Sequence, residues 1–241
     1  MSTEVNLPNH VLIGRYLQHF YDIPTHCPYE MSDQALYRQA QFGFVDDPLM
    51  KAFLASGFRR NGNTIYAMAC PECDACRSLR VNPLLFKPNR SQKRVLKKCS
   101  LVKAVVNTLE FTKEKLDLLD GFFAARFPAN ENDAASYYGT FFVNGITDTY
   151  EVEYRLDGEL MGVAVIDVGR HWLNAVYFYF DAQFNDLSPG VFNILFLLDL
   201  CLKQDIRHLY LGYSIEGHQP MAYKRAFNPH EIFYGDRWHD E

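Results

Sequence analysis

The sequence lacks any long hydrophobic run. Its longest apolar stretch, residues 191–202, contains Asn193 and Asp199, and it is shorter than the roughly 20 apolar residues that a membrane-spanning helix needs. The first nine residues have neither a basic flank nor an apolar core, so they do not indicate a secretory signal peptide. We therefore expect a cytoplasmic protein without membrane partners.

Several fingerprints of catalysis are also absent. The chain contains no Walker phosphate-binding loop, no Rossmann glycine pattern and no Gly-x-Ser-x-Gly nucleophile elbow. Its histidines do not have the spacing of a zinc protease. Hydrophobic residues make up 48% of the chain and charged residues 22%, which excludes a disordered protein, a collagen and a small disulfide scaffold. With 241 residues, the chain is long enough for one large domain or two small ones.

Acidic residues are missing from one segment of an otherwise acidic chain. The net charge of −5 argues by itself against a nucleic-acid partner, but residues 77–103 are rich in Lys and Arg and contain no Asp or Glu. Basic side chains neutralise phosphates, and Ser and Gln donate to phosphate oxygens. We expect residues 57–60 to extend this basic patch. The alternative interpretation of the basic segment is a helix face that is merely exposed to solvent. The candidate phosphate-binding residues are Arg90, Ser91, Gln92, Lys93 and Arg94, followed by Lys97 and Lys98.

Cysteine is concentrated in one place. Cys70, Cys73 and Cys76 follow one another at intervals of three, which lets their sulfurs face one point and suits zinc or an iron–sulfur cluster. A closed site needs a fourth ligand, for which Cys27 is the best candidate and His26 the reserve. The alternative is a turn shaped by buried thiols, and a disulfide is not expected in a reducing compartment.

The remaining pattern predicts an α+β protein. We expect residues 1–26 to be a weakly ordered N-terminal segment. Ser91 is the expected N-cap of a basic helix, and Thr112 that of the next helix. We expect two domains, residues 1–105 and 106–241. The expected helices span 48–56, 91–98, 112–127, 191–203 and 220–227, and the expected strands span 63–68, 79–81, 149–156, 159–168, 173–180 and 208–213.

Tyrosines gather in two of these segments. Tyr177 and Tyr179 share one face of an expected strand, and that face either belongs to the core or lines a pocket. Tyr213 and Tyr223 lie with Lys224 in a second segment that is rich in Tyr and Gly. Spacing alone identifies no reaction for either group.

Together, these stretches resemble the arginyl-tRNA–protein transferase superfamily, and most closely its bacterial branch, the aspartate/glutamate leucyltransferases. The resemblance runs from about residue 27 to 238. The Asn-Arg-Ser-Gln-x-Arg stretch after the triple cysteine is its most specific part. It is carried by residues 27–29, 57–60, 70–76, 79–81, 86–94, 153–155, 175–181, 209–213 and 221–231.

The resemblance implies an activity and a fold. A charged tRNA donates its amino acid, leucine or arginine, to the α-amine of a protein that begins with Asp or Glu, and the product is marked for an N-degron adaptor and protease. The C-terminal domain is expected to be acetyltransferase-like, with a mixed sheet and flanking helices. The transfer needs no cofactor, and the cysteine cluster would hold an iron–sulfur cluster or zinc.

Chemistry narrows the candidate residues for such a transfer. The donor ester is already activated, so an enzyme mainly has to position the amine and the carbonyl. Tyr hydroxyls or backbone N–H groups stabilise the oxyanion, which makes Tyr177, Tyr179, Tyr213 and Tyr223 candidate catalytic residues together with Lys224. An acidic acceptor side chain needs a cation, and the candidates are Arg77, Arg80 and Lys224.

Two other classes of protein remain open at this point. A non-catalytic RNA-binding or metal-sensing regulator would need the basic segment and the thiols, but no acceptor pocket. An acyl-CoA N-acetyltransferase would bind pyrophosphate through backbone N–H groups at a helix start. Here the comparable turn, residues 187–190, contains Pro189, which removes one such donor and argues against CoA.

Overall fold

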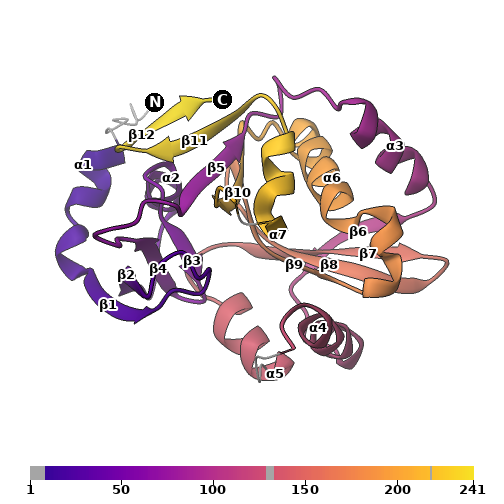
Figure 1. The fold of residues 1–241 in the computed structure, drawn as a ribbon, viewed down its shortest axis with the longest axis horizontal. Helices are drawn as coiled ribbons and strands as arrows, with labels where there is room; N and C mark the ends of the chain where they lie inside the picture. Colours follow the sequence, from indigo (N-terminus) through magenta and orange to yellow (C-terminus); the bar gives the residue numbers. More distant parts are fainter. Residues whose placement is uncertain (1–8, 129–132, 218) are drawn as a thin grey trace, which may run out of the picture.

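The chain folds around two β-sheets, as shown by a computed structural model that describes residues 9–128, 133–217 and 219–241 (Figure 1). A four-stranded sheet has the order β1-β2-β4-β3, and an eight-stranded sheet has the order β12-β11-β5-β10-β9-β8-β7-β6. No helix within the described ranges is long and apolar enough to cross a membrane.

The smaller sheet is built from the first part of the chain and is antiparallel throughout. The helix α2 packs beside it; Asp46 caps this helix by accepting a hydrogen bond from the Leu49 N–H, and Gly57, at φ +82°, follows it. The expectation of a weakly ordered N-terminal segment is wrong for residues 9–26, which form two short helical segments and an edge strand. The elements are α1 (Asn9–Gly14), η1 (Leu17–His19), β1 (Tyr21–His26), β2 (Gln34–Gln41), α2 (Asp47–Ala55), β3 (Arg59–Asn61) and β4 (Thr64–Met68).

The larger sheet combines strands from both ends of the chain. β5 lies between β10 and β11, so a strand from the first third of the sequence sits inside the C-terminal sheet. The predicted boundary at residue 105 falls within β6 of this sheet, and the division into two domains there stays a prediction. The strands are β5 (Arg77–Val81), β6 (Lys103–Thr108), β7 (Thr149–Leu156), β8 (Glu159–Val168), β9 (Trp172–Phe180), β10 (His208–Ser214), β11 (His230–Tyr234) and β12 (Arg237–Asp240).

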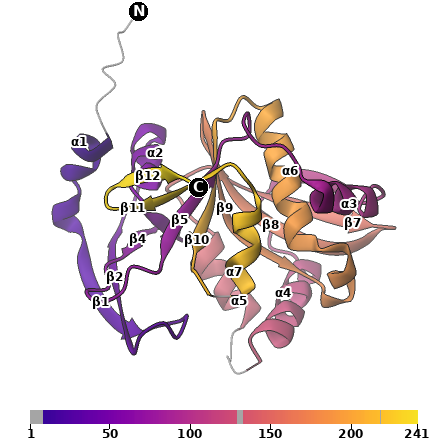
Figure 2. The same cartoon turned by 45° about the horizontal axis from the view of Figure 1, so that its top comes forward.

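Helices cover both faces of the larger sheet (Figures 1 and 2). The apolar helix α6 packs on one face through a core that includes Leu197 and Leu209, whereas α4 covers the other face through Leu119 against Val163. Thr112 caps α4, as predicted. The helical segments here are α3 (Arg90–Lys98), α4 (Lys113–Arg126), α5 (Ala134–Tyr137), η2 (Tyr138–Phe142), η3 (Ala182–Leu187), α6 (Pro189–Lys203), α7 (Gln219–Ala222) and η4 (Tyr223–Ala226).

A buried ion pair joins the two sheets. Arg60 on β3 donates from Nε and Nη2 to the two carboxylate oxygens of Asp167 on β8, at 2.8 and 2.6 Å. Its remaining donors reach the Phe141 carbonyl and the Thr149 hydroxyl. The side chains of Arg60 and Asp167 are 0% and 1% exposed. Arg60 is therefore a structural link and does not extend the basic patch, contrary to our expectation.

Candidate active site at the split between β9 and β10

The two parallel strands of the larger sheet separate after a short paired stretch. β9 and β10 are joined through α6 and pair only at three positions, the last of which is Tyr210 opposite Asn174. Beyond this point the carboxyl half of β9 and the end of β10 no longer pair with each other. Backbone groups on the facing edges are therefore available to a ligand, at the carboxyl ends of parallel strands where ligands of α/β sheets commonly bind.

A β-bulge lies in each strand beside this split. The register between β8 and β9 shifts so that Val176 has no partner, and the register between β10 and β5 shifts at Leu211. Gly212 follows the second bulge with a φ of +78°, a conformation that favours glycine. A bulge changes the direction of the backbone groups next to it. The facing edges of β9 and β10, which we call the two rims of the split, therefore present backbone groups in orientations that a regular strand would not provide.

Tyr213 stands on the β10 rim between the two sheets. Its side chain is buried, and its hydroxyl oxygen accepts a hydrogen bond from the Met68 N–H on β4, at 3.2 Å. Burial raises the pKa of Tyr213 well above 10. The Arg59 guanidinium from β3 lies 5.1 Å from the centroid of the Tyr213 ring. On the other side, Lys224 donates from Nζ to the Tyr213 carbonyl oxygen, at 3.0 Å.

Among the described residues, no acidic side chain pairs with Lys224 to offset its positive charge. Burial, followed by the nearby charge of Arg59, lowers the pKa of Lys224 to about 7. A lysine with such a pKa exchanges protons at neutral pH, which is the property that acid–base catalysis requires. Its neighbour Tyr223 packs beside the start of α6, where a Cβ on Gly190 would lie 3.5 Å from the Tyr223 ring. Lys224, Tyr213 and Tyr223 are thus brought together, as three of the predicted catalytic residues.

The other two predicted tyrosines, Tyr177 and Tyr179, lie on the face of the larger sheet that α4 covers. Tyr179 is fully buried in the core under α4, and its hydroxyl has no hydrogen-bond partner among the described residues. Tyr177 packs against Tyr137 and Phe142, and burial raises its pKa to about 12. Because Tyr179 has no accessible surface, we do not retain it as a residue that touches substrate.

The two arginines predicted to meet an acidic acceptor are already paired. Arg80 forms a two-point ion pair with Glu231, at 2.7 and 2.6 Å, and its guanidinium lies 4.1 Å from the centroid of the Trp238 ring. Arg77 pairs with Asp74 at 2.6 Å. Arg59, by contrast, has no carboxylate partner among the described residues, and the sequence showed it only as part of a basic stretch.

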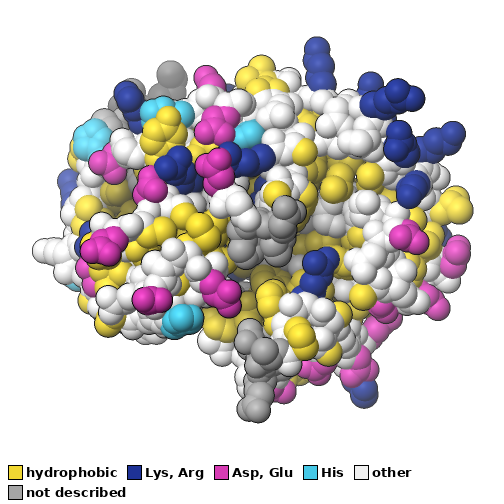
Figure 3. Space-filling model, viewed as in Figure 1, with side chains coloured by type: hydrophobic (Ala, Val, Ile, Leu, Met, Phe, Trp, Pro, Cys, Tyr) yellow, Lys and Arg dark blue, Asp and Glu magenta, His cyan; other side chains and the backbone are white. Residues whose placement is uncertain are grey.

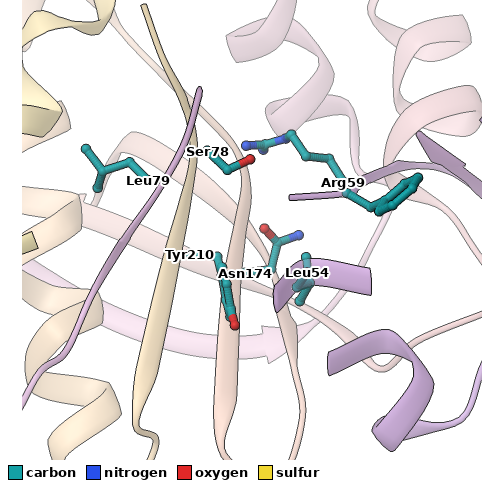
Figure 4. A pocket seen from close by; sticks show the side chains of 8 residues that line it. Leu54, Arg59, Ser78, Leu79, Asn174 and Tyr210 are labelled. Atoms are coloured by element: carbon teal, nitrogen blue, oxygen red, sulfur yellow. The ribbon is translucent and has the colours of Figure 1, made fainter. Parts of the chain in front are cut away.

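Arg59 lines a small crevice where the two sheets meet. Figure 4 shows its side chain extending from β3 toward Ser78 on β5. Gly212 lies so close that a Cβ there would come within 1.9 Å of Arg59 Nη1. Asn174 lines the same crevice at the point where β9 and β10 part.

The basic helix α3 presents its charges to solvent. Asn89, not Ser91, is the N-cap: its side chain accepts a hydrogen bond from the Gln92 N–H, and the Gln92 side chain accepts one from the Asn89 N–H. Asn89 has the extended backbone conformation of a cap, whereas Ser91 is already helical. Five basic side chains of α3 are exposed and gather on one side of the molecule (Figure 3). They are Arg90, Lys93, Arg94, Lys97 and Lys98.

One hydrogen bond ties this basic helix to the site. Gln92 is 3% exposed, and its Nε2 donates to the Ala226 carbonyl oxygen at 3.1 Å, at the end of the segment that carries Tyr223 and Lys224. The amide of Gln92 is therefore used within the protein and is not free for phosphate. Ser91 remains exposed on the first turn of α3.

The four predicted metal ligands are neighbours, but they are not arranged as a ligand set. Burial, and then the charges of Cys70, Cys27 and Cys73, raise the pKa of Cys76 to about 12. Burial also opposes ionisation of Cys27, yet hydrogen bonds from the backbone N–H groups of residues 29, 31 and 32 outweigh it and lower the Cys27 pKa. No group of three or more His, Cys, Asp or Glu side chains within the described ranges is placed to hold a metal ion. His26 points to solvent from β1.

The sequence matches two related family descriptions. Residues 25–94 match "Arginine-tRNA-protein transferase, N terminus", and residues 114–234 match "Arginine-tRNA-protein transferase, C terminus". The "Aspartate/glutamate leucyltransferase" of Methylobacillus flagellatus is 34% identical over 80% of this chain and 79% of its own length. The protein of that name from Shewanella amazonensis is 35% identical over 88% of this chain and 90% of its own length.

Solved structures resemble this fold at low sequence identity. The C-terminal domain of a putative lysylphosphatidylglycerol synthetase from Agrobacterium fabrum has a TM-score of 0.53 at 12% identity, covering 97% of this chain and 85% of that one. FemX has a TM-score of 0.51 at 9% identity, covering 94% and 89%. These likenesses concern the fold alone. With the mixed sheet and its flanking helices they confirm the expected α+β, acetyltransferase-like architecture.

The two matched segments include the first part of α3, the split and the residues around Tyr213. Catalytic activity follows from the family, so the non-catalytic regulator is no longer needed to explain the basic helix. The chain belongs to the arginine-tRNA–protein transferase family, and it is an aminoacyltransferase.

Proposed function

We propose that this chain transfers leucine from leucyl-tRNA to the N-terminal α-amine of proteins that begin with Asp or Glu, and so marks them for an N-degron adaptor and protease in the cytoplasm. The observation that carries the proposal is the bond between Gln92 and Ala226, which ties an exposed basic helix to the segment of Lys224. A phosphate-binding surface and a site for amine chemistry are thereby held in one rigid arrangement. The names of the relatives supply the donor and the acceptors.

The split between β9 and β10 is the proposed place of the donor ester. Its unpaired backbone N–H groups are suited to stabilising the oxyanion that forms when the amine attacks the ester carbonyl. The α-ammonium of the acceptor has an ordinary pKa of about 7.7–8.0, close to the pKa of about 7 of Lys224. Neutral Lys224 is therefore able to take up the proton that the amine loses before it attacks. The ester C–O bond then breaks as the new amide bond is completed, and the ribose oxygen of the tRNA leaves and takes up a proton.

The function is tested by transfer of radiolabelled amino acids from charged tRNA to peptides. We expect label from leucyl-tRNA on peptides that start with Asp or Glu, and none on matched peptides that start with Ala or Lys. Transfer from arginyl-tRNA instead would reassign the donor, which the family description leaves as the second candidate. Absence of transfer from both tRNAs would contradict the proposal.

The exposed charges of α3 are proposed to bind the tRNA backbone. In an Arg90→Gln/Arg94→Gln variant, the slope of log affinity against log salt should flatten by about 0.7–0.9 for each lost phosphate contact. Lys113→Gln is the control, because Lys113 is also exposed but pairs with Asp117 on α4. Binding measured at several salt concentrations decides: an unchanged slope in the double variant would show that α3 does not contact phosphate.

We also propose that Cys27, Cys70, Cys73 and Cys76 bind zinc or an iron–sulfur cluster. Support comes from the backbone N–H groups that stabilise the Cys27 thiolate, because thiolates are the metal-binding form. The described arrangement does not itself form a ligand set, so no catalytic step is assigned to a metal. Anaerobically purified protein should contain iron or zinc that is lost in Cys73→Ser; less than roughly one tenth of an equivalent would favour a purely structural turn.

A further inference from the structure

Two basic side chains beside the split have no acidic partner. Among the described residues, no carboxylate oxygen lies within ion-pair distance of Arg59 or Lys224, and Lys224 donates to the Tyr213 carbonyl. Both side chains are partly exposed and therefore reachable. A guanidinium carries five N–H donors, so Arg59 is able to offer a carboxylate two of them.

The neighbouring arginines differ sharply in this respect. Arg60, Arg77 and Arg80 each have a carboxylate oxygen at 2.6 Å. Of these four arginines, Arg59 is the one without a carboxylate partner among the described residues, although it comes from the same short strand as the fully paired Arg60. Arg59 and Lys224 approach the Gly212–Tyr213 segment from two different elements, β3 and η4.

The protein holds the Arg59 guanidinium in a defined place. Any side chain at position 212 would overlap it, because a Cβ there would lie 1.9 Å from Nη1, and the Tyr213 ring lies 5.1 Å from its central carbon. Arg59 is also close enough to Lys224 to contribute to the lowered pKa of that lysine. Two basic groups brought together in a partly buried site are unfavourable unless an anion joins them.

We propose that Arg59, beside Lys224, binds the side-chain carboxylate of the acceptor's N-terminal Asp or Glu. The inference rests on the proposed function and names the part of the site that selects the acceptor. A guanidinium binds a carboxylate through two parallel hydrogen bonds, and Lys224 remains the neighbouring group that takes up the proton of the α-amine. In Asp and Glu the α-amine is only a few covalent bonds from the carboxyl group, so a carboxylate bound here places the amine at the β10 rim of the split.

This assignment replaces Arg77 and Arg80 in the role that we expected of them. Both arginines are already neutralised by Asp74 and Glu231. A substrate carboxylate would have to displace those partners, whereas at Arg59 it has no carboxylate of the described residues to displace.

The test compares acceptor selectivity at saturating leucyl-tRNA. We expect Arg59→Met to lower the ratio of kcat/KM for Asp-starting over Asn-starting peptides by about 10- to 100-fold, because a charge-assisted hydrogen bond is lost. The loss of selectivity should appear mainly in KM for the Asp peptide, because any effect of Arg59 on the pKa of Lys224 acts on both peptides alike and cancels in the ratio. Arg59→Lys keeps the charge but loses the planar fork, so it should lose only part of the selectivity. Arg77→Met is the matched control and should leave the ratio unchanged.

The possible outcomes separate this inference from the function on which it rests. If the wild-type protein does not transfer to acidic peptides, the proposed function fails and the inference falls with it. If the wild type transfers but Arg59→Met keeps the full Asp-over-Asn ratio, or Arg77→Met loses as much, only the inference is overturned. If Arg59→Met shows no cooperative thermal unfolding, the variant is not folded and Arg59→Lys is used instead. An unchanged Asp-over-Asn ratio of kcat/KM in Arg59→Lys then counts against the proposal.

Discussion

Replacing Arg60 with methionine is expected to lower the free energy of unfolding by about 3–5 kcal/mol. Arg60 uses its guanidinium to bridge β3 of the smaller sheet and β8 of the larger one, and Asp167 is 1% exposed. Methionine leaves that carboxylate with hydrogen bonds from Thr149 and Asn174, but without an opposite charge. An unpaired buried carboxylate costs several kcal/mol, whereas the apolar replacement itself fits a buried position.

Urea unfolding at neutral pH measures this loss. Arg38→Met is the matched control, because Arg38 also pairs with an aspartate at 2.8 Å, but in a pair that is 50% and 36% exposed; its loss should cost less than about 1 kcal/mol. The double variant Arg60→Met/Asp167→Leu should recover much of the stability, since it removes the unpaired charge. Equal small effects of Arg60→Met and Arg38→Met would refute a structural role for this pair.

Replacing Lys224 with methionine is expected to reduce leucyl transfer by at least about 100-fold and, at the same time, to stabilise the fold by about 1–3 kcal/mol at pH 7. In the folded protein, burial and the charge of Arg59 lower the pKa of Lys224 to about 7, against about 10.4 in an unfolded chain. The folded state therefore binds fewer protons than the unfolded state between these values. We expect less than the full linkage energy, because the variant also loses the hydrogen bond to the Tyr213 carbonyl.

The pH dependence gives this prediction a clear sign. The cost of keeping Lys224 is fully present below the folded pKa of about 7, and it disappears as the pH rises to the unfolded value of about 10.4. The stability advantage of Lys224→Met should therefore be largest at pH 7 or below and should vanish by about pH 10.

Lys203→Met serves as the control for this lysine. Lys203 is 68% exposed on α6 and pairs with Asp199, so its replacement should change stability by no more than about 0.5 kcal/mol at any pH. Chemical unfolding of both variants between pH 6 and 10 is the measurement. A destabilised Lys224→Met variant whose difference from wild type does not change with pH would contradict a charge held unfavourably at the site.

Helices and central strands with strong local patterns were predicted correctly. Thr112 caps α4 as expected, and the hairpin of β7 and β8 turns at Asp157 and Gly158, where the sequence shows a turn pair. These features depend on residues close together in the chain, because caps and tight turns are satisfied locally. The cap of α3 was misplaced by two positions, since Asn89 and Ser91 are both good cap residues and only the backbone conformation distinguishes them.

Strands with weak local patterns were missed, whether their partner is the next strand or one far along the chain. β1 has an entirely exposed burial pattern and pairs with β2 along one edge of the smaller sheet, so it carries no hydrophobic alternation. β11 pairs with β5, about 150 residues earlier in the sequence. Neither strand has a strong pattern of its own, because its stability comes from hydrogen bonds and packing with a partner that the local sequence does not specify.

The sequence by itself determined the family, the basic character of α3 and the clustering of cysteines, because motifs and charge runs are properties of contiguous residues. Only the tertiary structure decided which cations are free. Arg59, Arg60, Arg77 and Arg80 are chemically identical, yet three of them pair with carboxylates, whereas Arg59 has no carboxylate partner within the described part of the chain. The physical reason is that whether a charge is neutralised depends on its nearest neighbours in space, and these come from strands far apart in the chain.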